Sequence, residues 1–161
     1  MQKQNIVMPS QLAKERKNLH LAFIKKVQSF GWVSKDENVT TIKGLYLLKV
    51  CKVETSRALS LEMLKQVQRD VQIVTREWMC TFLVENYFEF DLNNFQLCTK
   101  QQINKIIRVL KYVIGLNDQA IINYIGETVG RKTTANYLSI NEANKVIQRS
   151  EKWEAKVLIG R

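Results

Sequence analysis

One short segment of the chain, residues 130–139, brings together the kinds of side chain that bind phosphate. It reads GRKTTANYLS and supplies two cationic and two hydroxyl side chains, Arg131, Lys132, Thr133 and Thr134. It ends at Ser139, which precedes an apolar-periodic stretch and can begin a helix. The free N–H groups of a helix start, with cationic side chains nearby, suit a phosphate group. The segment therefore predicts contact with phosphate.

A second segment, residues 51–60, also contains one lysine, one arginine and hydroxyl residues. It reads CKVETSRALS and ends at another serine before an apolar-periodic stretch. We expect nucleic acid to contact basic and hydroxyl residues from both segments and from the helix after Ser139, namely Lys52, Arg57, Arg131, Lys132, Thr133, Thr134 and Lys145. The alternative is that both segments are ordinary capped turns with exposed charges. Neither matches a helix-turn-helix closely enough to assign a base-reading helix.

The other reactive residues form no catalytic or metal-binding pattern. His20 is the single histidine and lies beside apolar residues on a basic helix, so we expect a half-buried or solvent-facing imidazole. The cysteines, Cys51, Cys80 and Cys98, are too widely spaced for a zinc finger and indicate reduced, mostly buried thiols. The segment GETVGRKT lacks the Gly-x4-Gly-Lys-Ser/Thr spacing of a phosphate-binding loop. We expect no enzymatic activity, no metal and no cofactor.

Charge narrows the class of partner. Among 161 residues, Lys and Arg number 25 against 15 acidic residues, a formal net charge of +10. Residues 1–75 and 100–161 are both basic, whereas residues 76–99 are acidic. This surplus favours a polyanionic partner, nucleic acid first, although it can also serve only to keep the surface soluble.

The N-terminal stretch lacks the apolar core of a signal peptide, and no apolar run is long enough to cross a bilayer. We therefore expect a cytoplasmic, nucleoid-associated protein with no membrane partner.

The elements that position these residues are predicted to be helical almost throughout, because apolar residues recur at steps of three and four. Capping boxes at Thr99 with Gln102 and at Ser139 with Glu142 predict two helix starts. One apolar stripe predicts a single long helix after Ser60, with the stripe facing the core. The stripe consists of Leu64, Val67, Val71, Val74 and Trp78. A homodimer seam is the alternative for this stripe.

We expect an all-α fold with two related small helical lobes at residues 10–76 and 99–161. The long helix and an acidic, aromatic connector at residues 77–98 would join them. The connector contains Phe88, Phe90 and Phe95. These rings either pack the lobes together or form a surface that holds a protein partner, which would make the chain an adaptor subunit.

The two lobes are predicted to be copies of one helical unit. When Ser60 is placed on Ser139 without gaps, matching residues fall together at Val50 and Val129, Lys52 and Arg131, Thr55 and Thr134, Leu59 and Leu138, and Val67 and Val146. Further upstream, each lobe has an apolar-basic helix that ends at a glycine, Gly31 or Gly115. Convergence of similar helical hairpins is the alternative to a duplication.

One pattern of residues extends over both halves of the chain. In the second half it consists of Thr99, Gln102, Ile106, Gly115, Tyr124, Gly130, Leu138, Ser139, Glu142, Ala143 and Ile147. In the first half it consists of Arg16, Gly31, Tyr46, Val50, Leu59 and Ser60. This pattern resembles the regulatory protein GemA family of Mu-like phages. Residues 77–98 depart from the family pattern, because they are longer and more aromatic.

The resemblance implies a phage- or prophage-encoded modulator of host gene expression that acts through DNA topology in the host cytoplasm. Together with the charge, it leads us to expect a non-enzymatic, nucleic-acid-associated regulator. A protein–protein adaptor that uses the aromatic connector is the alternative.

Overall fold

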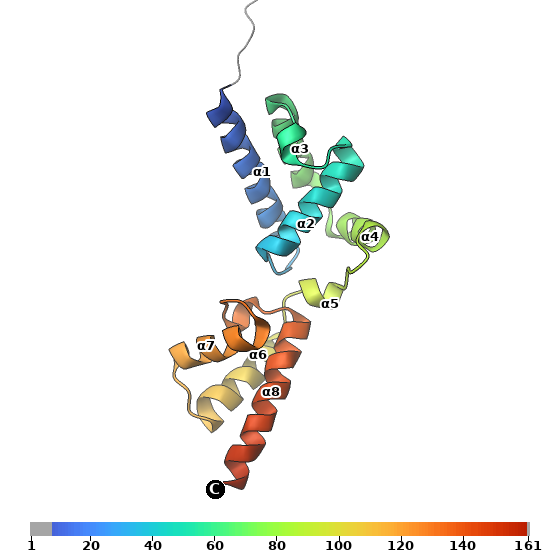
Figure 1. Ribbon diagram of the computed structural model, residues 1–161. Helices are drawn as coiled ribbons and strands as arrows, with labels where there is room; N and C mark the ends of the chain where they lie inside the picture. Colours follow the sequence, from blue (N-terminus) through green and yellow to red (C-terminus); the bar gives the residue numbers. More distant parts are fainter. Residues whose placement is uncertain (1–7, 161) are drawn as a thin grey trace, which may run out of the picture. The chain divides into compact units, whose positions relative to one another are not determined.

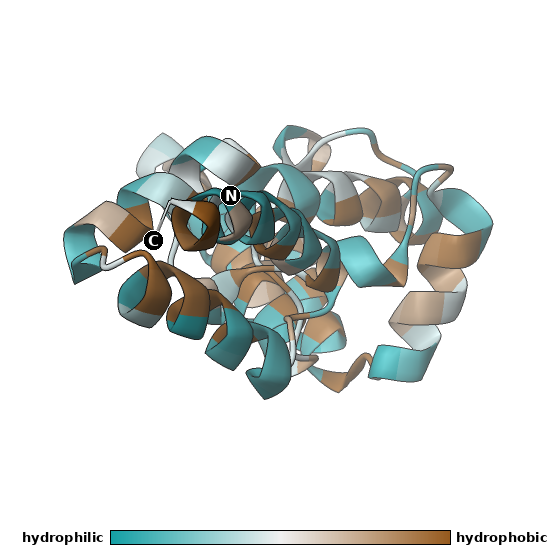
Figure 2. Cartoon of the chain, turned by 90° about the horizontal axis from the view of Figure 1, so that it is seen from below, coloured by the Kyte–Doolittle hydropathy of each residue, from teal (hydrophilic) through white to brown (hydrophobic). Residues whose placement is uncertain are grey.

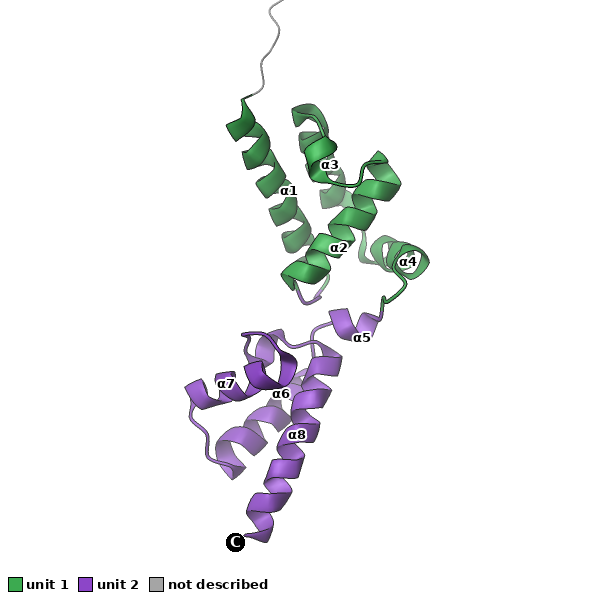
Figure 3. Ribbon diagram, in the orientation of Figure 1, with its two compact units in different colours: residues 1–30, 34–90 green, residues 31–33, 91–161 purple. Residues whose placement is uncertain are grey.

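The computed structural model describes residues 8–160, and the regular elements in this range are helices (Figure 1). The prediction of an all-α fold is confirmed. The chain divides into two compact units (Figure 3). Unit 1 contains residues 1–30 and 34–90, and unit 2 contains residues 31–33 and 91–161.

Unit 1 is built around a helix that packs against two others. Its α-helices are α1 (Pro9–Ser29), α2 (Asp36–Tyr46), α3 (Leu61–Ile73) and α4 (Arg76–Asn86). A π-helical turn at Leu47–Cys51 continues α2, and a 3-10 turn at Ser56–Ala58 precedes α3. The α1 helix packs against α2 and α3 and buries Leu19, Phe23 and Val27. The helices are amphipathic, with brown and teal residues on different sides in Figure 2.

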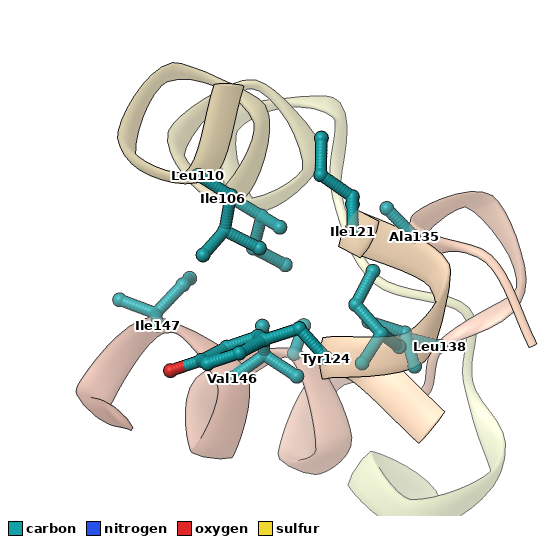
Figure 4. Close-up of a cluster of buried hydrophobic side chains, with 10 residues drawn as sticks. Ile106, Leu110, Ile121, Tyr124, Ala135, Leu138, Val146 and Ile147 are labelled. Atoms are coloured by element: carbon teal, nitrogen blue, oxygen red, sulfur yellow. The ribbon is translucent and has the colours of Figure 1, made fainter. Parts of the chain in front are cut away.

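Unit 2 has its own hydrophobic core. Its α-helices are α5 (Leu92–Phe95), α6 (Lys100–Ile107), α7 (Asp118–Val129) and α8 (Ile140–Ile159). A π-helical turn at Arg108–Val113 continues α6, and a 3-10 turn at Ala135–Tyr137 precedes α8. Figure 4 shows side chains from these elements converging, among them Ile106, Leu110, Ile121, Tyr124, Leu138 and Val146. Burial of these apolar surfaces drives the folding of the unit.

The short segment of residues 31–33 belongs to unit 2, where it pairs with the segment after α5. The N–H of Val33 donates to the carbonyl oxygen of Phe95 at 2.6 Å, and the N–H of Leu97 donates to that of Gly31 at 2.9 Å. The rings of Trp32 and Phe95 meet edge-on with centroids 6.3 Å apart. Phe95 is only 3% exposed, so its ring is buried and is not part of an open partner surface.

The long helix predicted from Ser60 past Trp78 is wrong, because the chain breaks between α3 and α4. Val74 adopts an extended conformation, and the Thr75 hydroxyl accepts a hydrogen bond from the N–H of Trp78 at 3.1 Å. Thr75 is therefore the N-cap of a new helix. A Thr side chain that bonds a nearby backbone N–H competes with helix continuation, and the preceding β-branched residues favour the extended state.

The break leaves Trp78 at the surface of unit 1. Its side chain is 44% exposed, against the prediction that it lies in the core. The indole stacks on Phe82 with centroids 5.1 Å apart and meets the ring of Tyr46 edge-on at 6.0 Å. One side of the ring is therefore packed and the rest faces solvent.

The connector predicted at residues 77–98 is divided between the units, with residues 77–90 in unit 1 and residues 91–98 in unit 2. Its phenylalanines consequently have different surroundings. Phe88 is fully exposed, Phe90 is half-buried, and Phe95 is buried. Phe88 and Phe90 belong to unit 1, whereas Phe95 belongs to unit 2.

The two units share the local structure that the serine alignment predicts. In each, a helix is followed by a 3-10 turn and then by a serine N-cap. The Ser60 hydroxyl accepts from the N–H of Met63 at 3.2 Å, and the Ser139 hydroxyl accepts from the N–H of Glu142 at 3.1 Å. Both serines are N-caps, as predicted. The helix before the turn ends at a left-handed residue in each unit, Lys52 (φ 60°) or Gly130 (φ 76°).

Candidate nucleic-acid interface

Arg131, the central residue of the predicted phosphate site, is engaged within unit 2. Its Nε donates to Glu142 Oε2 at 3.0 Å and its Nη2 donates to Glu142 Oε1 at 2.8 Å. Nη2 also donates to the carbonyl oxygen of Tyr137 at 2.7 Å. Only 22% of the Arg131 side chain and 10% of the Glu142 side chain are exposed. This bidentate pair holds the turn that leads into α8.

Glu142 joins this pair to the start of α8. Its Oε1 also accepts from the N–H of Ser139 at 2.9 Å, which completes the predicted capping box. Arg131 therefore fixes the carboxylate that caps the helix. At this helix start, the N–H of Ser139 is bonded to the Glu142 carboxylate, the N–H of Ile140 to the Gln96 carbonyl oxygen, and the N–H of Glu142 to the Ser139 hydroxyl. These N–H groups are therefore not available to a phosphate.

The neighbouring threonines are also turned inward. Thr133 is 9% exposed, and its hydroxyl donates to the carbonyl oxygen of Thr134 at 3.3 Å. The hydroxyl oxygen of Thr134 is buried and has no hydrogen-bond partner among residues 8–160. Neither hydroxyl is placed to contact a polymer at the surface.

The remaining predicted contacts are exposed basic residues. Lys132 and Lys145 lie on the surface of unit 2, and Lys52 and Arg57 lie on the surface of unit 1. Of the site predicted from sequence, these four cationic side chains stay accessible to a polyanion.

Lys145 is one member of a larger basic surface on α8. Four exposed cationic residues follow one another at steps of four, three and four along this helix, Lys145, Arg149, Lys152 and Lys156. Such steps place side chains on one side of an α-helix. We call this surface the α8 basic face. Of these four residues only Lys145 was predicted from the sequence, although the helical spacing of the basic residues is a signal that identifies the other three.

Glu142 of α8 shares the spacing of this face but is paired with Arg131, and the other two acidic residues of the helix lie on another side and are neutralised. Glu151 pairs with Lys105 at 2.6 Å, and Glu154 pairs with Arg108 at 3.4 Å. Both partners belong to α6 or to the π turn that follows it. The α8 basic face thus keeps its positive charge, except at Arg149, whose Nη2 lies 3.7 Å from Glu127 Oε2.

An open groove between α7 and α8 borders this face. It has a volume of about 480 Å³ and is lined by Tyr124, Glu127, Arg149, Lys152, Trp153 and Lys156. We call it the α7–α8 groove. It combines an aromatic wall with cationic side chains, which is the combination that proteins use to hold nucleic-acid strands.

The aromatic wall consists of Tyr124 and Trp153, whose ring centroids are 5.4 Å apart with a 33° tilt. The Arg149 guanidinium lies over the Tyr124 ring, 4.4 Å from its centroid, and its Nη1 donates to the Thr128 hydroxyl at 2.7 Å. The Tyr124 hydroxyl is buried without a hydrogen-bond partner among residues 8–160. Burial raises its pKa, against a smaller lowering by Arg149.

The corresponding helix of unit 1 does not carry this charge pattern. In the serine alignment, Lys145, Arg149 and Lys152 fall on Gln66, Asp70 and Ile73 of α3. The groove beside α3, about 380 Å³, contains Lys25 and Lys26, but Lys26 Nζ donates to the carbonyl oxygen of Gln72 at 2.6 Å near the end of α3. The basic aromatic groove is therefore a property of unit 2.

His20 belongs to a polar chain that links α1 to α2. Its Nε2 lies 2.9 Å from Asp36 Oδ1, and its Nδ1 lies 2.9 Å from Lys43 Nζ. Burial lowers the pKa of Lys43, and Asp36 opposes this shift. The geometry fits an imidazole that accepts from Lys43 and donates to Asp36. The chain packs the two helices together.

The cysteines are free thiols whose pKa values are raised, in each case chiefly by burial. A raised thiol pKa disfavours the reactive thiolate. Within the described part of the chain, no group of His, Cys, Asp and Glu residues is arranged to hold a metal ion. Nor is any of its helices both long and apolar enough to span a membrane.

Comparisons with known proteins found no matching family model, no matching curated protein and no matching solved structure.

Proposed function

We propose that this protein is a non-enzymatic, nucleic-acid-associated regulator that contacts DNA phosphates through the α8 basic face. The observation that supports the proposal is the single-sided row of exposed cations along α8, with the acidic residues of the same helix paired elsewhere. Binding through phosphates positions a protein on nucleic acid without reading its sequence. The overall charge of +10 adds long-range attraction to the same partner.

The role in gene expression rests on the resemblance to the GemA family of Mu-like phages. A phage or prophage regulator that acts on DNA topology needs affinity for the backbone more than for particular bases. The α8 basic face fits this requirement, because long flexible cations contact phosphates of any sequence.

A salt titration of binding to duplex DNA tests the proposal. With about five phosphates contacted, the slope of log K against log salt concentration should be about −4 to −5. Fluorescence anisotropy with a labelled duplex of arbitrary sequence gives this slope. No binding at low salt, or binding that is independent of salt, would contradict the proposal.

A protein–protein adaptor is the second candidate function, and one observation favours it. Phe88 is fully exposed and Val84, at the end of α4, is 71% exposed. Contiguous exposed apolar patches mark partner surfaces, and these two side chains would contribute apolar area to such a patch. Phe88→Ser should then abolish association with that partner while leaving the melting temperature and DNA binding unchanged.

A further inference from the structure

We propose that the α7–α8 groove binds an unpaired nucleobase of a single strand, so that the protein favours single-stranded over duplex nucleic acid. This inference rests on the proposed function and adds the class of strand that the site accepts. Trp153 lines the groove and is half-buried, so part of its indole is accessible while Tyr124 supports it from the side. Stacking of a base on an aromatic side chain is tolerant of sequence, because every base has a π-face.

The cations around Trp153 place the phosphates of the same strand. Lys152 and Lys156 lie one residue before and three residues after Trp153 on α8, and both line the groove. Glu127 occupies the other end beside Arg149 and repels a phosphate there. A nucleotide therefore fits with its base at Trp153 and its phosphate at Lys152 and Lys156.

The length of the α8 basic face favours a strand over a free nucleotide. From Lys145 to Lys156 the helix rises about 16 Å, which is several phosphate spacings along a strand. A free nucleotide would use only the groove and leave Lys145 without a contact. In a duplex, by contrast, the bases are stacked inside and cannot reach the indole without being flipped out.

The groove also offers a base a polar partner. The Tyr124 hydroxyl is buried with no partner among the described residues, and buried polar groups of this kind are costly. Tyr124 lines the groove beneath the Arg149 guanidinium, so a bound base that displaces Arg149 from the ring brings its edge donors and acceptors to this hydroxyl.

The test compares a labelled single strand of about 12 nucleotides with the duplex of the same sequence at one low salt concentration. The variant is Trp153→Leu, and the matched control is Trp78→Leu, a surface indole of unit 1. We expect Trp153→Leu to weaken single-strand binding by about 5- to 100-fold and duplex binding by less than about twofold. Trp78→Leu should change neither. Equal effects of Trp153→Leu on both ligands would overturn the inference.

Two further measurements keep the test valid if Trp153→Leu destabilises unit 2. Trp153→Phe retains an aromatic ring and should give an intermediate single-strand affinity. In the wild-type protein, a strand containing 5-bromodeoxyuridine should photo-crosslink to Trp153, as mapped by mass spectrometry. Crosslinks only outside the groove would contradict base stacking there.

Competition separates the sources of the nucleotide. We expect a nucleoside monophosphate to compete at least about 100-fold more weakly than the 12-nucleotide strand, because it cannot use the length of α8. Equal competition would overturn the assignment of a strand. If neither strand nor duplex binds at low salt, the proposed function itself fails. Salt-dependent duplex binding without a single-strand preference refutes only this inference.

Discussion

At the level of single residues, Arg131 shows how one side chain can satisfy a binding pattern and yet serve the fold. Its guanidinium pairs with Glu142 and with the Tyr137 carbonyl, and both charged side chains are largely buried. Arg131→Ala would leave a mostly buried carboxylate without its cation. We expect it to lower the free energy of unfolding by about 3 kcal/mol, measured by urea denaturation followed by circular dichroism.

The neighbouring Lys132 provides the matched control, because it is exposed and adjacent in the chain. Lys132→Ala should change stability by less than about 0.5 kcal/mol. If the two variants are equally stable, the structural role assigned to Arg131 is wrong and a phosphate role becomes the better explanation.

Tyr124 gives a second prediction, which depends on pH. Tyr124→Phe removes a buried hydroxyl that has no partner in the described structure, so it should stabilise the protein by about 1 kcal/mol at neutral pH. Burial raises the pKa of Tyr124 above the ordinary tyrosine value of about 10, so above that pH the unfolded state loses its proton before the folded state does. Stability therefore falls with rising pH in the wild type.

The Tyr124→Phe variant should lose less stability above pH 10 than the wild type. Urea denaturation of both proteins between pH 8 and about pH 11 measures the difference, in the range where a tyrosine titrates. An identical pH dependence of the two proteins would show that Tyr124 titrates as it does in the unfolded chain.

At the residue level, local patterns could be predicted and long-range partners could not. The capping box of Ser139 and Glu142 is a four-residue signal, and it is present as predicted. That Glu142 also holds Arg131 depends on how the chain turns between residues 131 and 142. The residue type and the neighbours of Arg131 suggested a binding role, but its pairing with the Glu142 carboxylate, 11 residues further along the chain, could not be predicted from the sequence.

At the level of elements, the break between α3 and α4 determines how much Trp78 contributes to the stability of the protein. The ring is 44% exposed and packs mainly on Phe82. Trp78→Ala should therefore cost about 1 to 2 kcal/mol, less than the roughly 3–5 kcal/mol of a fully buried aromatic ring. The adjacent Met79 is 1% exposed, so Met79→Ala should cost more, about 2 to 5 kcal/mol.

Thermal and urea denaturation of the two variants shows directly which substitution lowers the stability more. A larger loss for Trp78→Ala than for Met79→Ala would indicate that the indole is the better-packed side chain and that α3 continues into α4 in solution.

The same break explains why periodicity failed at this point. Val74 and Trp78 continue the spacing of the α3 stripe, so an apolar pattern alone favours one helix. The opposing signal was local, since Thr75 can cap a helix and Ile73 and Val74 are β-branched. Serine N-caps were predicted correctly in both units because each depends on neighbouring residues only.

At the level of the whole molecule, the net charge predicts a polyanionic partner but does not predict where on the surface that partner would bind. The sequence has a net charge of +10, and basic residues are common in both halves. Of the four residues of the α8 basic face, only Lys145 was predicted from the sequence. The other three residues were assigned to this face from the fold, because the fold shows which side of α8 is exposed and which acidic residues are paired with α6 or the turn after it.

The central claim is that the α8 basic face contacts nucleic-acid phosphates, and the most direct test is the salt dependence of duplex DNA binding in two charge-matched variants. One carries Lys145→Gln, Lys152→Gln and Lys156→Gln on α8. The other carries Lys14→Gln, Lys17→Gln and Lys25→Gln on the exposed side of α1.

The wild-type slope of about −4 to −5 should fall to about −2 in the α8 variant and change by less than about 1 in the α1 variant. Equal changes in both variants, or an unchanged slope in the α8 variant, would contradict the account.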